Sequence, residues 1–390
     1  MNVNLIQEVR NNHETVVSWR RALHQIPELG ITLPKTAAFI VEKLTEMGIS
    51  CELYEDCSCV TATIGKGGKC ILLRADMDGL PVVEESGLPY ASVNGCSHAC
   101  GHDFHAASLL GAAKILKAHE ADLPGTVKLI FQSGEEVFKG AAAAIAHGVL
   151  ANPKVDAAFA THVFAGMPLN TVLYGKYAMA SVYGFKIRIQ GKGTHGSSPE
   201  SGVDPLTAGA NILLALQSII AREISASDEA ALTIGHFEGG SVANVIPDSA
   251  VLEGTLRTFK PEIKAYIIPR ITEIAESIAK TYRASVTVEE LSNVPSVVSD
   301  DGMTAMMENA VREVGNGMVL YSGMHAMGSE DFAFYSERVP SVMVGLGAGV
   351  EDKTKWVGQH NPRVLFHEDI LENEVALYVK IALDYLEANK

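Results

Sequence analysis

The chain has 390 residues, which is too long for one compact core and predicts two or three domains. Hydrophobic residues make up 47% of the chain and charged residues 20%, as in ordinary globular proteins. The formal net charge of −15 argues against a nucleic-acid or anionic-membrane partner, because phosphate groups bind to cationic surfaces.

The N-terminal segment, MNVNLIQEVRNNHETVV, has no basic stretch followed by an apolar stretch, so it does not resemble a secretion signal. The longest apolar runs, such as GAAAAIAHGVL, are too short or too interrupted to span a bilayer. We therefore expect a cytoplasmic protein without a membrane partner.

Strand and helix signals alternate through the first part of the chain. The segments that carry them are 32–49 (helix), 69–78 (strand), 105–120 (helix), 126–136 (strand) and 155–163 (strand). Such alternation predicts an α/β domain with a mixed, mostly parallel sheet flanked by helices.

Chemically active side chains follow the predicted strands at their carboxyl ends. Asp76 and Asp78 follow the first of these strands, Glu135 and Glu136 the second, and His162 lies at the end of the third. Ligands of open α/β sheets bind at that edge, so we expect a functional site there.

The middle of the chain changes character. Residues 178–292 read as strand, helix, strand, strand, helix, strand, with Asp204 as the N-cap of the first helix and Pro205 in its first turn. This order is typical of a ferredoxin-like α+β module. The α/β alternation resumes after it.

The stretch CSHACGHDFH, from Cys96 to His105, contains two cysteines and three histidines. Thiolate and imidazole are ligands of zinc and similar metals, so the stretch indicates a metal site, although a chance cluster on a loop stays open. The spacing is not that of a zinc finger. A disulfide framework is disfavoured in a cytosolic chain of this length, and Cys51 and Cys70 are predicted to be reduced core residues.

Three further segments, SGEEV, ATHV and GQHNP, each have an ordinary explanation alone: a solvated loop, a core histidine and a polar turn. Together with the cysteine–histidine stretch they supply several metal ligands, a carboxylate that need not bind metal, and a place for water. That combination suits a hydrolytic metal centre.

A series of motifs extends this interpretation from His24 to Glu368. In chain order they are LHQIPELG, LRADMDGLP, HACGHDFHA, QSGEE, THV, GKGTHGSSPESGVDP, NVIPD, GSEDFAFY and QHNPRVLFHED. This series resembles the M20 metallopeptidase family. The most similar branch is that of amidohydrolases acting on N-acyl and auxin–amino acid conjugates, aminobenzoyl-glutamate and hippurate-like compounds.

The resemblance implies two divalent metal ions per subunit, with zinc, manganese, cobalt and nickel all suited to the mixed ligands. It implies Cys100 as a bridging thiolate, His102 and His162 as further ligands of one metal, and Glu136 and His360 as those of the other. It implies Glu135 as general base and Asp76 as an acid that supports the ligands. Arg74 stands where peptidase branches have a metal-binding histidine, so His102 takes over that role. A cysteine–histidine nucleophile at Cys100 is the alternative.

The resemblance also implies roles for the inserted module. His195, in GKGTHGSSP, is expected to donate to the oxyanion, within its own chain or in a neighbouring subunit. Asn244 and Arg257 match substrate-carboxylate contacts, and a homodimer through this lid domain is expected. His98 and His105 are candidates for supporting positions, whereas His119, His147, His236 and His367 are interpreted as surface or packing residues.

Because His360 has to reach ligands that precede residue 165, the catalytic domain is predicted to be discontinuous: residues 1–177 and 293–390, with 178–292 as the lid. The expected activity is hydrolysis of the amide of N-acyl-L-amino acids or related small conjugates, which releases a carboxylic acid and an amino acid. A dipeptidase or carboxypeptidase with the same centre is the alternative within enzymes. A metal-binding scaffold without activity is disfavoured, because a pure binder has no use for both Glu135 and Glu136.

Overall fold

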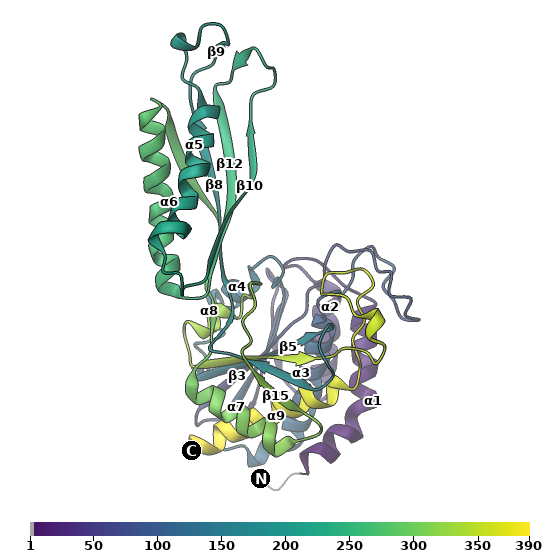
Figure 1. Ribbon diagram of the computed structural model, residues 1–390. Coiled ribbons are helices and arrows are strands. Elements are labelled where there is room, and N and C mark those ends of the chain that lie inside the picture. The colour runs from purple at the N-terminus through teal and green to yellow at the C-terminus, as the bar shows by residue number, and fades with distance from the viewer. Residues whose placement is uncertain (1–3) are drawn as a thin grey trace. The chain divides into compact units, whose positions relative to one another are not determined.

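The structure is a computed structural model that describes residues 4–390, so the first three residues of the N-terminal segment discussed above lie outside it. The chain divides into two compact units (Figure 1). The larger unit runs to Ala178 and takes in Val298–Met324 and Asp331–Lys390. The smaller unit consists of Met179–Val297 and His325–Glu330.

An eight-stranded sheet forms the centre of the larger unit, in the order β1-β2-β4-β3-β5-β16-β6-β15. Its strands are β1 (Cys51–Tyr54), β2 (Cys59–Gly65), β3 (Cys70–Asp76), β4 (Thr126–Gln132), β5 (Ala157–Phe164), β6 (Thr171–Tyr174), β15 (Val319–Ser322) and β16 (Ser341–Gly347). The pairs β4–β3, β3–β5, β5–β16 and β6–β15 are parallel. The pairs β1–β2, β2–β4 and β16–β6 are antiparallel. The predicted mixed, mostly parallel sheet is confirmed.

Helices flank this sheet, as the alternation of signals predicted. They are α1 (Leu5–His24), α2 (Pro34–Glu46), α3 (His102–Ala118), α4 (Gly140–Ala146), α7 (Asp301–Val314), α8 (Ala333–Ser336) and α9 (Ile370–Ala388), with single 3₁₀ turns at Glu120–Asp122 and Lys353–Lys355. α3 and α9 contact each other and the central strands β3 and β5. Both helices are buried on nearly all sides, and most of their buried residues are apolar.

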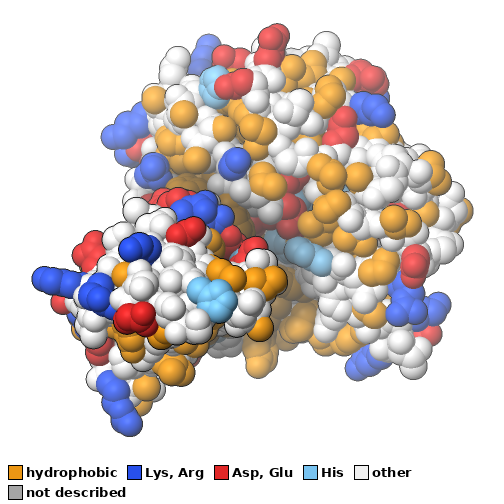
Figure 2. All heavy atoms as spheres, turned by 90° about the horizontal axis from the view of Figure 1, so that it is seen from above, with side chains coloured by type: hydrophobic (Ala, Val, Ile, Leu, Met, Phe, Trp, Pro, Cys, Tyr) orange, Lys and Arg blue, Asp and Glu red, His pale blue; other side chains and the backbone are white. Residues whose placement is uncertain are grey.

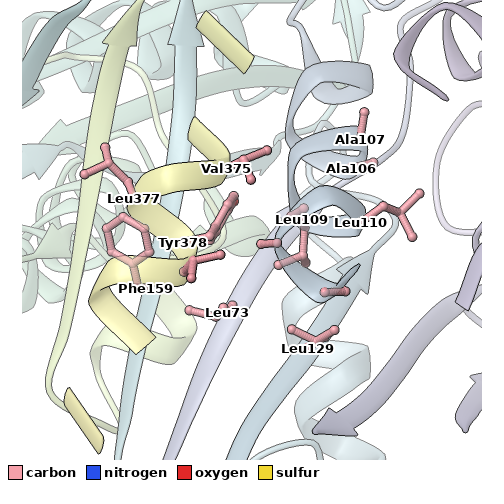
Figure 3. Close-up of a cluster of buried hydrophobic side chains, with 14 of the residues drawn as sticks. Leu73, Ala106, Ala107, Leu109, Leu110, Leu129, Phe159, Val375, Leu377 and Tyr378 are labelled. Carbon is pink, nitrogen blue, oxygen red and sulfur yellow. The ribbon is translucent and has the colours of Figure 1, made fainter. Parts of the chain in front are cut away.

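The core of the larger unit lies between α3, α9 and the central strands. Figure 3 shows Leu73, Leu129 and Phe159 from the strands in one cluster with Leu109 and Tyr378 from the helices. All five side chains are fully buried. Burial of a large apolar side chain stabilises the fold by about 1.5–3 kcal/mol. The cluster therefore stabilises the three strands whose ends lead to the candidate site.

The smaller unit contains the elements β8 (Ser181–Gln190), α5 (Pro205–Ser218), β10 (Ala230–Gly239), β12 (Ser249–Thr258), α6 (Pro261–Thr281) and β13 (Ser285–Val294). Its antiparallel sheet has the order β10-β12-β8-β13. The predicted β-α-β-β-α-β order is confirmed. Asp204 caps α5 by accepting a hydrogen bond from the Leu206 N–H at 2.9 Å, with Pro205 in the first turn.

Shorter elements complete the chain. They are β9 (Thr194–His195) paired with β11 (Val245–Ile246), β7 (Tyr177–Met179) paired with β14 (Val297–Val298), a 3₁₀ turn at Pro199–Ser201 and a π-helical turn at Ile219–Glu223. Across the part of the chain that the structure describes, no helix has both the length and the hydropathy needed to cross a membrane.

Candidate metal centre

The strands and one helix end bring the candidate ligands to one edge of the large sheet. β3 ends at Asp76, β4 is followed by the loop with Glu135 and Glu136, and His162 lies near the end of β5. Gly101 directly precedes α3 with φ of 91°, a left-handed conformation that glycine adopts without steric cost. A Cβ there would lie 2.4 Å from Val163 Cγ2, so the turn into the helix requires glycine.

Cys100, His102 and His162 form the first group of possible ligands. Their ligand atoms all lie within 4.8 Å of one another, and all three residues are buried. Cys100 Sγ is 3.4 Å from His162 Nε2. His162 Nδ1 donates to the Val163 carbonyl at 2.8 Å, which leaves the Nε2 lone pair directed toward the thiol.

Cys100, Glu136 and His360 form the second group, again with ligand atoms within 4.8 Å of one another. His360 Nε2 is 3.4 Å from Glu136 Oε1. The His360 N–H donates to the Ala99 carbonyl at 3.0 Å, which ties this late loop to the cysteine segment. Cys100 belongs to both groups, so its sulfur could serve two metals.

Glu135 and Glu136 are placed differently although they are adjacent in the chain. His102 Nε2 lies 4.0 Å from Glu135 Oε2 and 3.9 Å from Glu136 Oε1. Glu136 Oε1 also lies 3.4 Å from His360 Nε2. One carboxylate can therefore join the second group while the other remains beside it.

Several polar atoms of these groups are buried without a hydrogen-bond partner among residues 4–390: both ring nitrogens of His102 and Glu136 Oε1. Leaving a buried polar group unpaired costs about 1–3 kcal/mol, so native proteins rarely do so without an ion or water nearby. Sulfur, nitrogen and oxygen donors converge here, and the donor set fits divalent metals of the zinc class. On the face shown in Figure 2, histidine side chains lie beside acidic ones.

The electrostatics of the protein alone favour the neutral forms of Cys100 and His162, whereas for His102 the effect of burial is outweighed by the Asp76 carboxylate, which helps to raise the pKa of that ring well above its ordinary value. Burial raises the pKa of the Cys100 thiol to about 12. Burial also holds the pKa of His162 well below its ordinary value, so the ring is neutral and can coordinate. A bound cation would lower the pKa of the Cys100 thiol, because coordination stabilises the thiolate.

Arg74 and Asp76 form a buried network behind these ligands. Arg74 bonds to Asp76 Oδ2 at 2.6 Å, to Asp331 Oδ1 at 2.9 Å and to Gln132 Oε1 at 3.2 Å. The Val163 N–H donates to His105 Nε2 at 2.9 Å, so His105 Nδ1 carries the proton that it donates to Asp76 Oδ1. Both ring nitrogens of His105 are thus occupied, and His105 supports the site without offering a ligand atom.

Asp78 has a larger part in the site than the sequence indicated. Its Oδ1 accepts from the Glu135 N–H at 3.1 Å, and its Oδ2 accepts from the Glu136 N–H at 3.2 Å. Oδ1 also lies 3.4 Å from His102 Nδ1, without hydrogen-bond alignment. Asp78 therefore touches both glutamates and the histidine. In the sequence, the feature that could have indicated this role is the position of Asp78 two residues after Asp76, because side chains two apart in an extended segment lie on the same side.

The remaining candidates lie in the smaller unit. His195 is exposed at the end of β9 and pairs with Val245 of β11, directly after Asn244. The Asn244 carbonyl accepts from the Gly196 N–H at 2.7 Å. Arg257, half-buried in β12, donates to Ser329 Oγ at 2.6 Å. The structure thus brings His195 and Asn244 together within this unit and the metal-ligand candidates together within the other.

An α/β sheet whose edge carries two ligand groups that share a cysteine is typical of hydrolases with a metal centre. The chain matches the model of peptidase family M20/M25/M40 over residues 72–384. It belongs to this family and is a hydrolase.

Relatives of known name support the same branch of the family. The chain is 36% identical to N-acetyl-L-cysteine deacetylase of Bacillus subtilis (strain 168), covering 96% of this chain and 90% of the relative. It is 35% identical to IAA-amino acid hydrolase ILR1-like 4 of Arabidopsis thaliana, covering 95% and 86%. Among solved structures it is similar to the Bacillus subtilis YXEP protein, described as a dinuclear metal-binding peptidase from the M20 family. The TM-score is 0.83 at 33% identity, covering 97% of this chain and 99% of that one.

Proposed function

We propose that this chain is an amidohydrolase that cleaves the amide bond of N-acyl-L-amino acids or small related conjugates, using two divalent metal ions. The observation that carries the proposal is the pair of ligand groups that share Cys100. The deacetylase and the IAA-amino acid hydrolase among its relatives are both named for compounds in which an acyl group is joined to an amino acid.

We assign the ligands as the sequence predicted: Cys100 is shared, His102 and His162 complete one site, and Glu136 and His360 complete the other. The bound cations would supply Lewis acidity toward the amide oxygen and lower the pKa of water. Their identity among zinc, manganese, cobalt and nickel depends on supply as well as on the ligands.

Glu135 is the proposed general base. It would accept a proton from the attacking water and then donate it to the leaving amine, which departs as the amino acid. Its position supports this role, since Glu135 is 5% exposed and lies beside Glu136, which groups with Cys100 and His360. Asp78 would hold both glutamates through their backbone N–H groups, and Asp76 would support the centre through His105.

The proposed oxyanion donor is His195, and its tautomer supports the role. The Ser197 N–H donates to His195 Nδ1 at 3.2 Å, so Nδ1 is the acceptor and Nε2 carries the proton. An exposed Nε2–H can donate to an oxyanion on a substrate. Whether it would do so in its own chain or in the partner of a homodimer is a question for complementation between inactive variants.

Arg257 is proposed to bind the substrate carboxylate, with Asn244 as a second contact. Arg257 is half-buried, and within residues 4–390 no carboxylate forms an ion pair with it. Burial lowers its pKa. A half-buried guanidinium without a carboxylate partner is suited to an anionic ligand. A cytoplasmic location and dimerisation through the smaller unit complete the proposal.

The test is a screen of purified protein after exhaustive chelation and re-addition of Zn²⁺, Mn²⁺ or Co²⁺. The substrates are acetyl, benzoyl and indoleacetyl amino acids, with plain dipeptides for comparison. We expect no hydrolysis by the chelated protein and restored hydrolysis of acyl amino acids on adding metal. Full activity of a verified metal-free preparation would refute the metal centre, and activity on dipeptides alone would favour the peptidase alternative.

A further inference from the structure

A second cluster of metal-ligand side chains lies in the larger unit and shares no residue with the candidate metal centre. It joins the turn between β1 and β2 to the end of α4 and consists of Asp56, Cys57 and His147. One carboxylate oxygen, one sulfur and one ring nitrogen from these residues lie within 4.8 Å of one another.

The imidazole of His147 is held in place on two sides. Its ring stacks on Tyr54, the last residue of β1, with centroids 4.5 Å apart and planes 13° from parallel. Its Nε2 is 2.7 Å from Asp56 Oδ1. The ring therefore presents a nitrogen to the carboxylate before any ligand arrives, and a cation can take the place of the shared proton.

The thiol of Cys57 is fixed by the turn that carries it. The Cys57 N–H donates to the Tyr54 carbonyl at 3.2 Å, and the Cys57 carbonyl accepts from Ser133 Oγ. Ser58, which follows, has a positive φ of 51°, and its Oγ accepts from the Leu33 N–H at 2.8 Å. The Cys59 sulfur lies 3.5 Å from Ser133 Oγ, the same hydroxyl that donates to the Cys57 carbonyl. These contacts fix the backbone that carries the Cys57 sulfur.

We propose that Asp56, Cys57 and His147 bind a divalent cation of the zinc class at a site separate from the catalytic centre. Three protein ligands of types S, N and O leave the fourth tetrahedral position to water. The thiol selects against Mg²⁺ and Ca²⁺, which prefer oxygen ligands alone.

Access to this site is open on the side of Asp56, whose side chain is 71% exposed, and of His147, at 37%. A cation can therefore enter by separating one exposed hydrogen bond. The alternative use of two adjacent thiols is a redox pair. Cys57 and Cys59 are 1% and 0% exposed, which leaves little access for the partner thiol or oxidant that a redox pair needs. A cation is smaller and reaches the Cys57 sulfur from the side of the exposed Asp56 and His147.

The experiment measures Co²⁺ bound per chain by equilibrium dialysis under reducing conditions. The variants are Cys57→Ser, His147→Gln and Asp56→Ala, and the matched controls are Cys51→Ser and His119→Gln, which remove the same residue types elsewhere. We expect each of the three variants to bind about one equivalent less than the unaltered chain, because a site with two protein ligands holds metal weakly. The controls should bind the same amount as the unaltered chain.

Asp56→Ala keeps the experiment decisive if Cys57→Ser unfolds, because an exposed aspartate contributes little to folding. Equal binding by folded variants and the unaltered chain overturns the proposal. If two thiols are lost to a disulfide when reductant is left out, and the variants bind as much Co²⁺ as the unaltered chain, the proposal is overturned in favour of a redox pair. The difference of one equivalent is expected whether or not the catalytic centre also binds metal, so the two proposals fail separately.

Discussion

Replacement of Asp78 tests the interaction that holds the two glutamates in position. The carboxylate is 1% exposed and accepts hydrogen bonds from the N–H groups of Glu135 and Glu136 at 3.1 and 3.2 Å. A hydrogen bond to a charged group contributes about 1.5–3 kcal/mol. Asp78→Ala therefore makes local opening of this loop easier by roughly 10- to 100-fold at each amide.

Amide hydrogen exchange of the peptide that spans residues 133–139 measures this opening directly. We expect faster exchange by that factor in metal-free Asp78→Ala and an intermediate effect in Asp78→Asn, which keeps one acceptor oxygen. Asp301→Asn is the control, since that side chain is 88% exposed.

Asp78 also lies 3.4 Å from His102 Nδ1, so its loss should weaken metal binding. Removing a residue that supports a ligand typically reduces metal affinity by about 10- to 100-fold. Unchanged exchange in the loop of a folded Asp78→Ala protein would refute the reasoning, because the two amides would then be held by something else.

Three further changes have defined outcomes. Gly101→Ala should cost about 2–4 kcal/mol of stability, because φ is 91° and the new Cβ would meet Val163, whereas Gly48→Ala, with positive φ but no neighbour within 4 Å, should cost about 1 kcal/mol. Equal thermal shifts in the two would contradict this. Burial raises the pKa of the Cys70 thiol from 9.0 to about 11, so the unfolded chain loses this proton first and stability falls between pH 9 and 11. Cys70→Ala should remove roughly 3 kcal/mol of this loss of stability, measured by denaturant unfolding at both pH values, and an unchanged pH dependence would count against it. His195→Ala should lower turnover by about 10²–10³-fold with unchanged thermal unfolding, and near-normal turnover would exclude the oxyanion role.

The sequence predicted the fold well where local signals and long-range packing agree. The alternation of strand and helix segments gave the layered sheet, and Asp204 with Pro205 marked the start of α5. Registers and sheet order could not be predicted, because they depend on which buried faces meet. The antiparallel pairing of β16 with β6, beside its parallel pairing with β5, has no local signature.

The candidate site was predicted less evenly. Cys100 and His102 stand two residues apart in an unusual composition, so they were conspicuous, but the convergence of His360 on them depends on the return of the chain across the sheet. The contacts of Asp78 could not be predicted, because backbone N–H groups have no mark in the sequence. His147 was interpreted as a surface or packing residue. It is partly exposed and stacked on Tyr54, and only the structure places it beside Cys57.

The most direct test of the proposed catalytic centre compares Glu135→Gln with Glu136→Gln in metal content and in turnover of an N-acyl amino acid. If Glu135 is the base, Glu135→Gln keeps its metal and loses turnover by at least about 10²–10⁴-fold, the usual contribution of general acid–base catalysis. Glu136→Gln should instead lose metal at the site that includes His360, with part of the activity returning at high metal concentration. Exchanged phenotypes, or a fully active Glu135→Gln protein, would contradict the account.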